Sequence, residues 1–246
     1  RTNSQDEPEP DLALRWAVSP DGITYLFSLR RDVRWSDGEL FTADDVIFTI
    51  SLMQDPDFPG VPDVAKLWRT VRVDKMDDYT VRFQLQQPFP TFLDYTNVGI
   101  VPKHLLATVT AQTLTTHSFN THPVGTGPFM LSEISTRRAV LVPNPRYFGR
   151  KRPYLAAMEM RFYPTHENLL TAYQAGEIMG ISEVPPHLFP QVAHLPDLNI
   201  YSARISGFYI VYLKLQDEDR SPFFQTARVR QALLYGLDRQ ALIDSA

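Results

Sequence analysis

The chain has 246 residues, of which 43% are hydrophobic and 21% charged, proportions typical of a globular protein with room for more than one domain. Its formal net charge of -4 argues against a nucleic-acid partner, because such proteins carry basic patches and a high pI. The absence of cysteine excludes disulfides, thiolate zinc sites and cysteine nucleophiles. No apolar run reaches the roughly 20 residues that a membrane-spanning helix needs.

The N-terminal part predicts a turn, a strand, a second turn and a capped helix. Residues 19–22 read Ser-Pro-Asp-Gly, a typical turn, and residues 23–29 then alternate apolar and polar as a half-buried strand does. A Ser-Asp-Gly turn follows at residues 36–38. Thr42 is a good N-cap and Asp45 is its capping-box partner, so a helix should begin directly after Thr42.

The next stretch predicts a hairpin followed by short helices. In residues 71–85, two runs of alternating apolar and polar residues flank an Asp-Asp turn. This is the pattern of an antiparallel hairpin with one solvent-exposed face. Short helices are expected up to residue 95 and over residues 101–106. Residues 107–122 are rich in Thr, Ser, Asn and His and predict a surface loop.

Strands and helices alternate in the second half of the chain, which indicates a mixed α/β fold. The expected elements are a hairpin over 129–142, a strand over 158–163, a helix over 166–175, a strand near 178, a helix after 186, and strands over 198–202 and 208–215. Thr165 and Gly176 supply the N-cap and the C-terminal stop of the first of these helices.

The sequence lacks the usual signatures of catalysis and cofactor binding. It contains no nucleophile elbow, zincin, phosphate-loop or dinucleotide-binding motif. The adjacent acids at 44–45 and 77–78 are explained by a helix cap and a turn, and such neighbours rarely converge on one substrate atom. His117 and His122 are the closest histidine pair, but no carboxylate lies between them. We therefore expect no enzyme, no cofactor and no metal site; an enzyme whose carboxylates converge only in space stays the alternative.

Five segments resemble motifs of one known family, in that family's order. They are residues 19–46, 123–129 (PVGTGPF), 144–149 (NPRYFG), 175–178 (AGEI) and 229–239 (VRQALLYGLDR). The family is that of the bacterial extracellular solute-binding proteins, family 5, the receptors of oligopeptide, dipeptide and nickel ABC importers. Phe148 stands where the family usually has Trp, and Met179 where it usually has Asp.

The resemblance implies a periplasmic-binding-protein-like fold of type II, a mixed α/β architecture with two lobes. Residues 1–10 would be an exposed lead-in, and residues 11–122 an extra subdomain of the first lobe. Residues 123–205 would form part of the main sheet of that lobe, and residues 206–246 the hinge and the start of the second lobe. Because family members are longer at both ends, we expect a fragment that lacks most of the second lobe. Such a fragment should bind ligand weakly or not at all and should self-associate through uncovered apolar surface.

The resemblance also implies a function without catalysis. Two lobes would close over a peptide or similar small solute and deliver it to an ABC permease in the membrane. The alternatives are a nickel-chelate or sugar receptor of the same fold and a non-transport interaction or sensor protein. Such receptors act outside the cytoplasm, in the periplasm or as lipoproteins on the cell surface, and we expect no signal segment within this chain.

Four residues are candidate ligand contacts. Thr96 and Asn97 lie in a turn that, by resemblance, lines the cleft of family members. Tyr209 and Tyr212 lie on the expected central strand and offer a flat apolar body with a hydroxyl, although core packing is the competing interpretation for aromatic residues on a strand.

Overall fold

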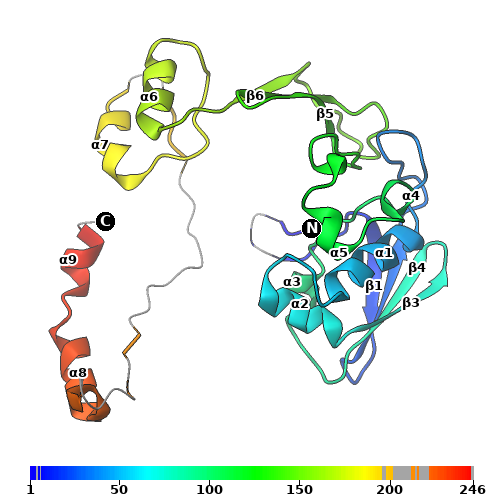
Figure 1. Cartoon of the computed structure of the whole chain (residues 1–246), viewed down its shortest axis with the longest axis horizontal. Helices are drawn as coiled ribbons and strands as arrows, with labels where there is room; N and C mark the ends of the chain where they lie inside the picture. The colour runs from blue at the N-terminus through cyan, green and yellow to red at the C-terminus, as the bar shows by residue number, and fades with distance from the viewer. Residues whose placement is uncertain are drawn as a thin grey trace. The chain divides into compact units, whose positions relative to one another are not determined.

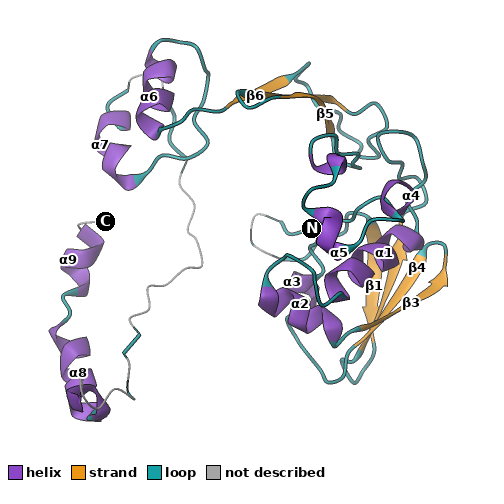
Figure 2. Cartoon of the chain, viewed as in Figure 1, coloured by secondary structure: helices purple, strands orange, loops and turns teal. Residues whose placement is uncertain are grey.

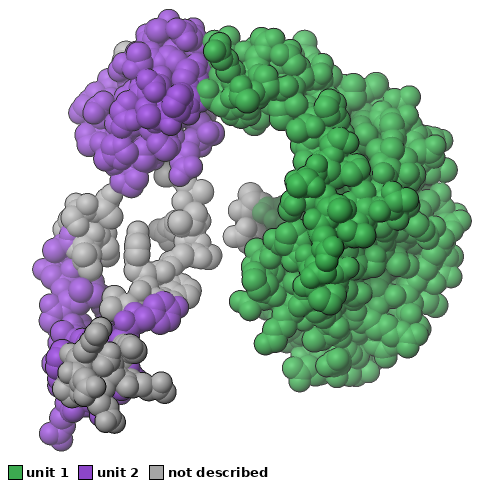
Figure 3. Space-filling view, viewed as in Figure 1, with its two compact units in different colours: residues 1–162 green, residues 163–246 purple. Residues whose placement is uncertain are grey.

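The structure is a computed structural model that describes residues 1–3, 5, 7–195, 198–201, 212–213, 215 and 222–244. The chain divides into two compact units, Arg1–Phe162 and Tyr163–Ala246, which Figure 3 shows in separate colours. Figure 1 labels the elements of each unit, and Figure 2 distinguishes helix, strand and loop.

A four-stranded antiparallel sheet forms one layer of the first unit, in the order β1-β2-β4-β3. The predicted Ser-Pro-Asp-Gly turn joins β1 (Ala13–Val18) to β2 (Thr24–Leu29), and β3 (Arg72–Asp77) pairs with β4 (Thr80–Gln84) as the predicted hairpin. Gly22 has a φ of 69°, a left-handed value that explains the glycine in the first turn. β2 and β4 are each paired on both edges and form the interior of the sheet, with β1 and β3 at its edges.

Helices form the second layer of this unit. α1 (Ala43–Gln54) packs against β3, β4 and α2 (Pro62–Arg69), and Figure 1 shows it lying across the sheet. Shorter helices follow along the chain. They are α3 (Phe92–Tyr95), α4 (Lys103–Leu106), α5 (Ala111–Leu114) and the 3-10 turn η1 (Ser118–Asn120).

The core between these layers is rich in aromatic side chains. Trp35, Trp68 and Phe92 are among its largest fully buried members, and Phe83 packs edge-on against Trp68 and Phe92. Aromatic residues bury large areas and prefer such tilted contacts. The predicted alternation of β2 is confirmed, because its inward residues join this core while Leu26 on the opposite face is exposed.

A three-stranded antiparallel sheet, β5-β6-β7, completes the first unit. Its strands are β5 (Phe129–Ile134), β6 (Arg138–Pro143) and β7 (Met158–Arg161), in agreement with the predicted hairpin and strand. Ile134 and Met160 are exposed, so part of the apolar surface of this sheet is uncovered.

The second unit is helical where the structure describes it. α6 (His166–Gln174) begins after the predicted N-cap Thr165, whose Oγ1 accepts the N–H of Asn168, and stops before Gly176 at a φ of 73°. The later elements are the 3-10 turn η2 (Pro186–Leu188), α7 (Phe189–Val192), the 3-10 turn η3 (Pro222–Gln225), α8 (Ala227–Gly236) and α9 (Arg239–Asp244).

Two of the strands predicted for the second unit are absent from the described residues, so these two predictions are wrong. Ile178 and residues 198–201 lie in irregular segments. A strand needs partners to complete its hydrogen-bond ladder, and the described part of this unit has no other strand to supply them. The strand predicted over residues 208–215 falls mostly outside the described residues.

Candidate functional site

Three of the segments that carry the family resemblance meet at one place in the first unit. The Ser36 N–H donates to the Gly125 carbonyl at 2.9 Å, and Arg146 Nη1 donates to the Ser36 carbonyl at 3.0 Å. Asn144, only 1% exposed, donates from Nδ2 to the Gly127 carbonyl at 2.9 Å. We call these five residues the motif joint. The three motifs hold one another's backbone in place there, so their role in this unit is structural.

Gly38 allows the motif joint to close. Its φ is 112°, in the left-handed region that favours glycine. A Cβ at this position would lie 3.4 Å from Arg146 Nε, an ordinary contact distance, so the guanidinium leaves room for it. The backbone conformation of the turn is what requires glycine here.

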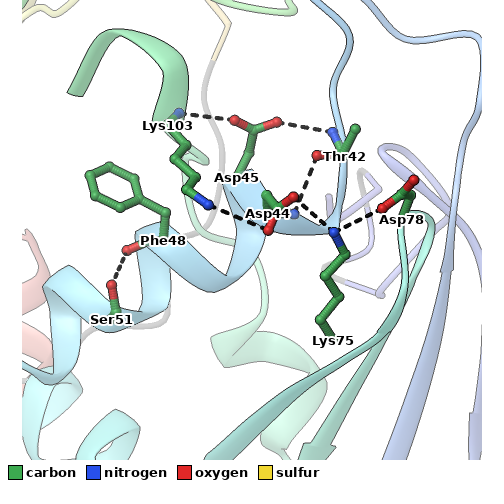
Figure 4. A network of polar contacts seen from close by, with 8 residues as sticks. All are labelled: Thr42, Asp44, Asp45, Phe48, Ser51, Lys75, Asp78 and Lys103. Carbon is green, nitrogen blue, oxygen red and sulfur yellow. Dashed lines mark hydrogen bonds and ion pairs between the residues drawn. The ribbon is translucent and has the colours of Figure 1, made fainter. Parts of the chain in front are cut away.

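The start of α1 is held by a buried carboxylate (Figure 4). Asp45 is 4% exposed and accepts the backbone N–H groups of Thr42 and Lys103, both at 2.9 Å. It also accepts the indole N–H of Trp35 at 3.4 Å. The predicted capping box of Thr42 and Asp45 is confirmed. One carboxylate therefore joins the start of α1 to the start of α4 and to the preceding turn.

The neighbouring Asp44 has different partners (Figure 4). Its carboxylate lies 2.8 Å from Lys75 Nζ and 3.4 Å from Lys103 Nζ, and Lys75 also bridges to Asp78. The hydrogen bond from Lys75 is the main reason why the pKa of Asp44 lies below its ordinary value, and the hydrogen bond to Asp44 is the main reason why the pKa of Lys75 is raised. Asp44 and Asp45 thus serve an ion-pair network and a helix cap, respectively.

The two histidines considered as metal ligands make local contacts. His117 Nδ1 accepts the Phe119 N–H at 3.1 Å, and His122 Nδ1 lies 3.0 Å from the Thr121 hydroxyl. Within the described ranges, no three His, Asp or Glu side chains are grouped so as to hold a metal ion. His104 has a stronger partner, since its Nε2 lies 2.7 Å from Asp37 Oδ2.

Thr96 and Asn97, two of the predicted ligand contacts, line a cavity of about 130 Å³ in the first unit. Thr96 Oγ1 donates to the Leu93 carbonyl at 2.7 Å, so its hydroxyl proton is already used. Asn97 is exposed, and its carboxamide makes no hydrogen bond within the part of the chain that the structure describes. Of the two residues, Asn97 is therefore the better placed to meet a ligand.

The other two predicted contacts fall in the sequence range of the second unit. Tyr209 lies outside the described residues. Tyr212 is 87% exposed and lies in an irregular segment of the second unit. All four contacts stay predictions.

The aromatic lining of the cavity has no counterpart among the predicted contacts. Trp16 and Trp68 line it, and they come from β1 and α2, two elements that the sequence patterns did not predict. Pro62 at the first position of α2 is the signal that could have found this helix, because proline is favoured there.

Solved structures of binding proteins share part of this fold. NikZ from Campylobacter jejuni, solved in complex with Ni(L-His), matches with a TM-score of 0.66 and 28% identity over 72% of this chain and 35% of NikZ. AppA from Bacillus subtilis, solved with a nonapeptide, matches with a TM-score of 0.67 and 29% identity over 72% of this chain and 36% of AppA. The predicted class is confirmed: this is a mixed α/β fold of the type II periplasmic binding proteins.

Sequence comparison leads from this class to a family. An ABC transporter peptide-binding protein of Brucella ovis is 31% identical over 245 residues, which cover 96% of this chain and 44% of the relative. The profile of the bacterial extracellular solute-binding proteins, family 5 Middle, matches residues 7–246. The chain belongs to this family, as its five motifs predict, and it spans less than half the length of the curated relatives it matches.

Proposed function

We propose that the chain is part of the substrate-binding component of an ABC importer, which captures a peptide or similar small solute and delivers it to a membrane permease. The family match over residues 7–246 carries this proposal. The peptide is supported by the name of the Brucella ovis relative and by the nonapeptide bound to Bacillus subtilis AppA. The protein would act as a receptor without catalysis, in the periplasm or as a lipoprotein on the cell surface. None of the described helices combines the length and apolar composition needed to cross a bilayer.

Capture would follow from the closure of two lobes. A solute that touches both lobes only in the closed state shifts the protein toward that state by its differential contacts. Asn97 would supply a contact from the first lobe, because its carboxamide is exposed and has no partner among the described residues. Thr96 would support it from the same turn, and Tyr209 and Tyr212 would approach from the hinge.

The proposal assigns a part of the binding protein to each stretch of the chain. Residues 11–122 would be the extra subdomain of the first lobe, after an exposed lead-in at 1–10. Residues 123–205 would contribute to the main sheet of that lobe, and residues 206–246 would form the hinge and begin the second lobe.

A nickel-chelate receptor is the second candidate. It is supported by the likeness to NikZ, which was solved with Ni(L-His). A chelate brings its own nitrogen and oxygen ligands, so the receptor needs few metal-binding side chains of its own.

Thermal-shift and calorimetric titration of the full-length protein that contains this chain, with dipeptides, oligopeptides, nickel-histidine and sugars, tests the proposal. We expect peptides alone to raise Tm, because a ligand that binds only the native state stabilises it by mass action. Asn97→Ala should weaken peptide binding about fivefold without changing the Tm of the free protein, since a lost hydrogen bond is worth about 1 kcal/mol. Gln87→Ala, an exposed carboxamide that does not line the cavity, is the control.

The other outcomes separate the alternatives. A shift with nickel-histidine or a sugar alone would replace the peptide by that solute. No shift with any solute, from a folded sample, would favour a non-transport interaction or sensor role.

Self-association is a further part of the proposal. Tyr154, Met179 and Tyr235 are 97%, 100% and 86% exposed, and large exposed apolar side chains favour association when they lie together. Sedimentation velocity should show oligomers that increase with concentration. A monomer at high concentration would count against this part of the proposal alone.

A further inference from the structure

The loop between β6 and β7 in the first unit is strongly basic. It reads Gly-Arg-Lys-Arg-Pro-Tyr-Leu over residues 149–155, so positive charges follow one another directly. From residue 134 to residue 158 every charged side chain is Lys or Arg, whereas the whole chain has a formal net charge of -4. A basic segment in an acidic chain favours an anionic partner for that segment.

The charges of this loop are not used by the fold. Arg150, Lys151 and Arg152 are exposed, and none of them has a hydrogen bond or an ion pair in the part of the chain that the structure describes. Two arginines nearby in sequence do have partners. Arg138 Nη2 lies 2.9 Å from Glu133, and Arg146 belongs to the motif joint. The three loop residues are therefore available to a partner.

The base of the loop is held in place. Asn144 and Arg146 fix it to the motif joint through their side chains. The Arg146 N–H also donates to Asn144 Oδ1 at 2.9 Å, and the Tyr147 N–H donates to the Asn144 carbonyl at 3.2 Å. These bonds form a tight turn directly before the basic residues. The charges are thus presented from a defined place on the first unit.

The charged neighbours of Arg150 do not cancel the charge of the loop. Arg150 lines a surface hollow of the first unit. The other charged residues of this hollow are Arg1, Arg30 and Asp11. Arg1 and Arg30 lie within 3.0 Å of carboxylates of their own, on Glu9 and Asp32. Of this lining, Asp11 alone opposes the three loop charges, so the loop keeps a net positive charge.

Two large apolar side chains follow the charges directly. Tyr154 is 97% exposed and Leu155 is 56% exposed. Tyrosine suits the boundary between water and lipid, because its ring is apolar and its hydroxyl is polar. Basic residues beside exposed aromatic and aliphatic side chains are typical of segments that lie in a membrane interface. A lipid surface accounts for both features of the loop, whereas a purely acidic partner would use only the charges.

We propose that residues 149–155 bind an anionic lipid surface. The three basic side chains meet the phosphate groups, and Tyr154 and Leu155 enter the headgroup region. Each basic residue near such a surface strengthens binding roughly fivefold, so the three together contribute roughly a hundredfold. The loop lies within the first unit, and its binding to lipid does not depend on the proposed capture of a solute.

Vesicle flotation measures this binding. The full-length protein that contains this chain, prepared without any lipid anchor, is mixed with vesicles of phosphatidylcholine alone or of equal parts phosphatidylcholine and phosphatidylglycerol. The protein concentration is kept below that at which sedimentation shows oligomers. We expect binding to the anionic vesicles only. High salt should abolish it, because salt screens exposed charges.

The charges are tested by replacing Arg150, Lys151 and Arg152 together with glutamine. This variant should bind the anionic vesicles roughly a hundredfold more weakly than wild type. Its Tm should be unchanged, because the three side chains have no partners among the described residues to lose.

A matched control removes the same net charge elsewhere in the first unit. It replaces Arg15, Lys66 and Arg137 with glutamine. These side chains are exposed, lie outside the loop and have no hydrogen bond or ion pair within the described ranges. The control should bind anionic vesicles almost as well as wild type. Equal losses in the two triple variants would mean that only the total charge matters, and would overturn the proposal.

The apolar contribution is tested by Tyr154→Ser combined with Leu155→Ser. Binding to anionic vesicles should weaken about tenfold, because less apolar area leaves water. Unchanged binding would mean that the loop recognises charge alone, as on an acidic protein, and would overturn the assignment to a lipid surface. Wild type that ignores anionic vesicles, or that binds neutral vesicles equally well, would overturn it as well.

Discussion

The two compact units differ in what holds them together. Arg1–Phe162 has a large aromatic core and two sheets, and its motif joint connects segments about a hundred residues apart in sequence. In the described part of Tyr163–Ala246, the buried cluster consists of Leu170, Leu188 and Val192. Apolar burial stabilises in proportion to area, so the first unit is stabilised by distant contacts and the second relies more on local features such as helix caps.

The largest expected effect tests this difference directly. Phe92→Ala should destabilise the first unit by about 4 kcal/mol, because the ring is fully buried against Trp68 and Phe83. Leu170→Ala should cost the second unit about 2 kcal/mol, the low end for a buried leucine, because so small a cluster can relax around the gap.

Two spectroscopic signals separate these effects in denaturant unfolding. All three tryptophans lie in the first unit, so fluorescence reports that unit alone, whereas far-ultraviolet circular dichroism reports both. Phe92→Ala should lower the fluorescence midpoint, and Leu170→Ala should leave it unchanged. Equal shifts in fluorescence would mean that the units unfold together and that the comparison fails.

The second prediction sharpens the view of the first unit by separating two adjacent acids. Asp45→Ala should cost about 3 kcal/mol, because it leaves the N–H groups of Thr42 and Lys103 and the Trp35 indole without their acceptor. Asp44→Ala, the matched control one residue away, removes only ion pairs at the surface and should cost much less. Fluorescence-detected unfolding measures both, and similar losses would show that Asp45 is not the anchor of α1.

The third prediction concerns a local feature of the second unit. Gly176→Ala should destabilise α6 by about 1 kcal/mol, because its φ of 73° strains any residue with a Cβ. Gly180→Ala is the control, since Gly180 does not have a positive φ and a Cβ there would meet nothing within 4 Å. Amide hydrogen exchange over α6 should be faster only in the first variant; equal exchange in both would show that the cap does not limit this helix.

The smallest expected effect is a pH dependence of the first unit. The pKa of Asp44 lies below its ordinary value of 3.8, chiefly because Lys75 donates a hydrogen bond to the carboxylate. The ionised group therefore stabilises the fold above that value, and the contribution is lost as the pH falls through the lowered pKa. Unfolding of wild type and Asp44→Asn should differ slightly at neutral pH, and the difference should shrink as the pH falls below 3.8. High salt should reduce the difference at neutral pH, and a difference that grows in acid would contradict the assignment.

Local patterns account for much of the fold that the sequence predicts. Four predictions depend on residues close in sequence: the alternation in β2, the Asp-Asp turn of the β3–β4 hairpin, the capping box of Thr42 and the N-cap at Thr165. The structure confirms the first three. At Thr165 the cap is confirmed through its bond from the Asn168 N–H. The strands predicted near Ile178 and over 198–202 need partners from elsewhere, and a single-sequence pattern does not supply them.

The candidate site was only partly accessible from sequence for the same reason. The turn at Thr96 and Asn97 could be placed because it follows a short helix, and both residues do line one cavity. Trp16 and Trp68, which also line the cavity, are about fifty residues apart in the chain. Trp16 lies in a strand without strict alternation and Trp68 in a helix that begins at Pro62, and no sequence pattern predicts that these two elements meet. That Trp68 Nε1 has no hydrogen-bond partner among the described residues becomes visible only when its neighbours in space are known.

The motif joint has a consequence for which substitutions the chain can tolerate. The loop at 123–129 is held through the carbonyls of Gly125 and Gly127, atoms that every amino acid possesses, whereas the opposite side needs the particular carboxamide of Asn144 and the guanidinium of Arg146. Only one side of the motif joint therefore depends on the identity of its side chains. A saturation-mutagenesis library scored for folding should accept many residues at Thr126 and very few at Asn144, because the buried amide of Asn144 is required whereas the loop contributes backbone carbonyls.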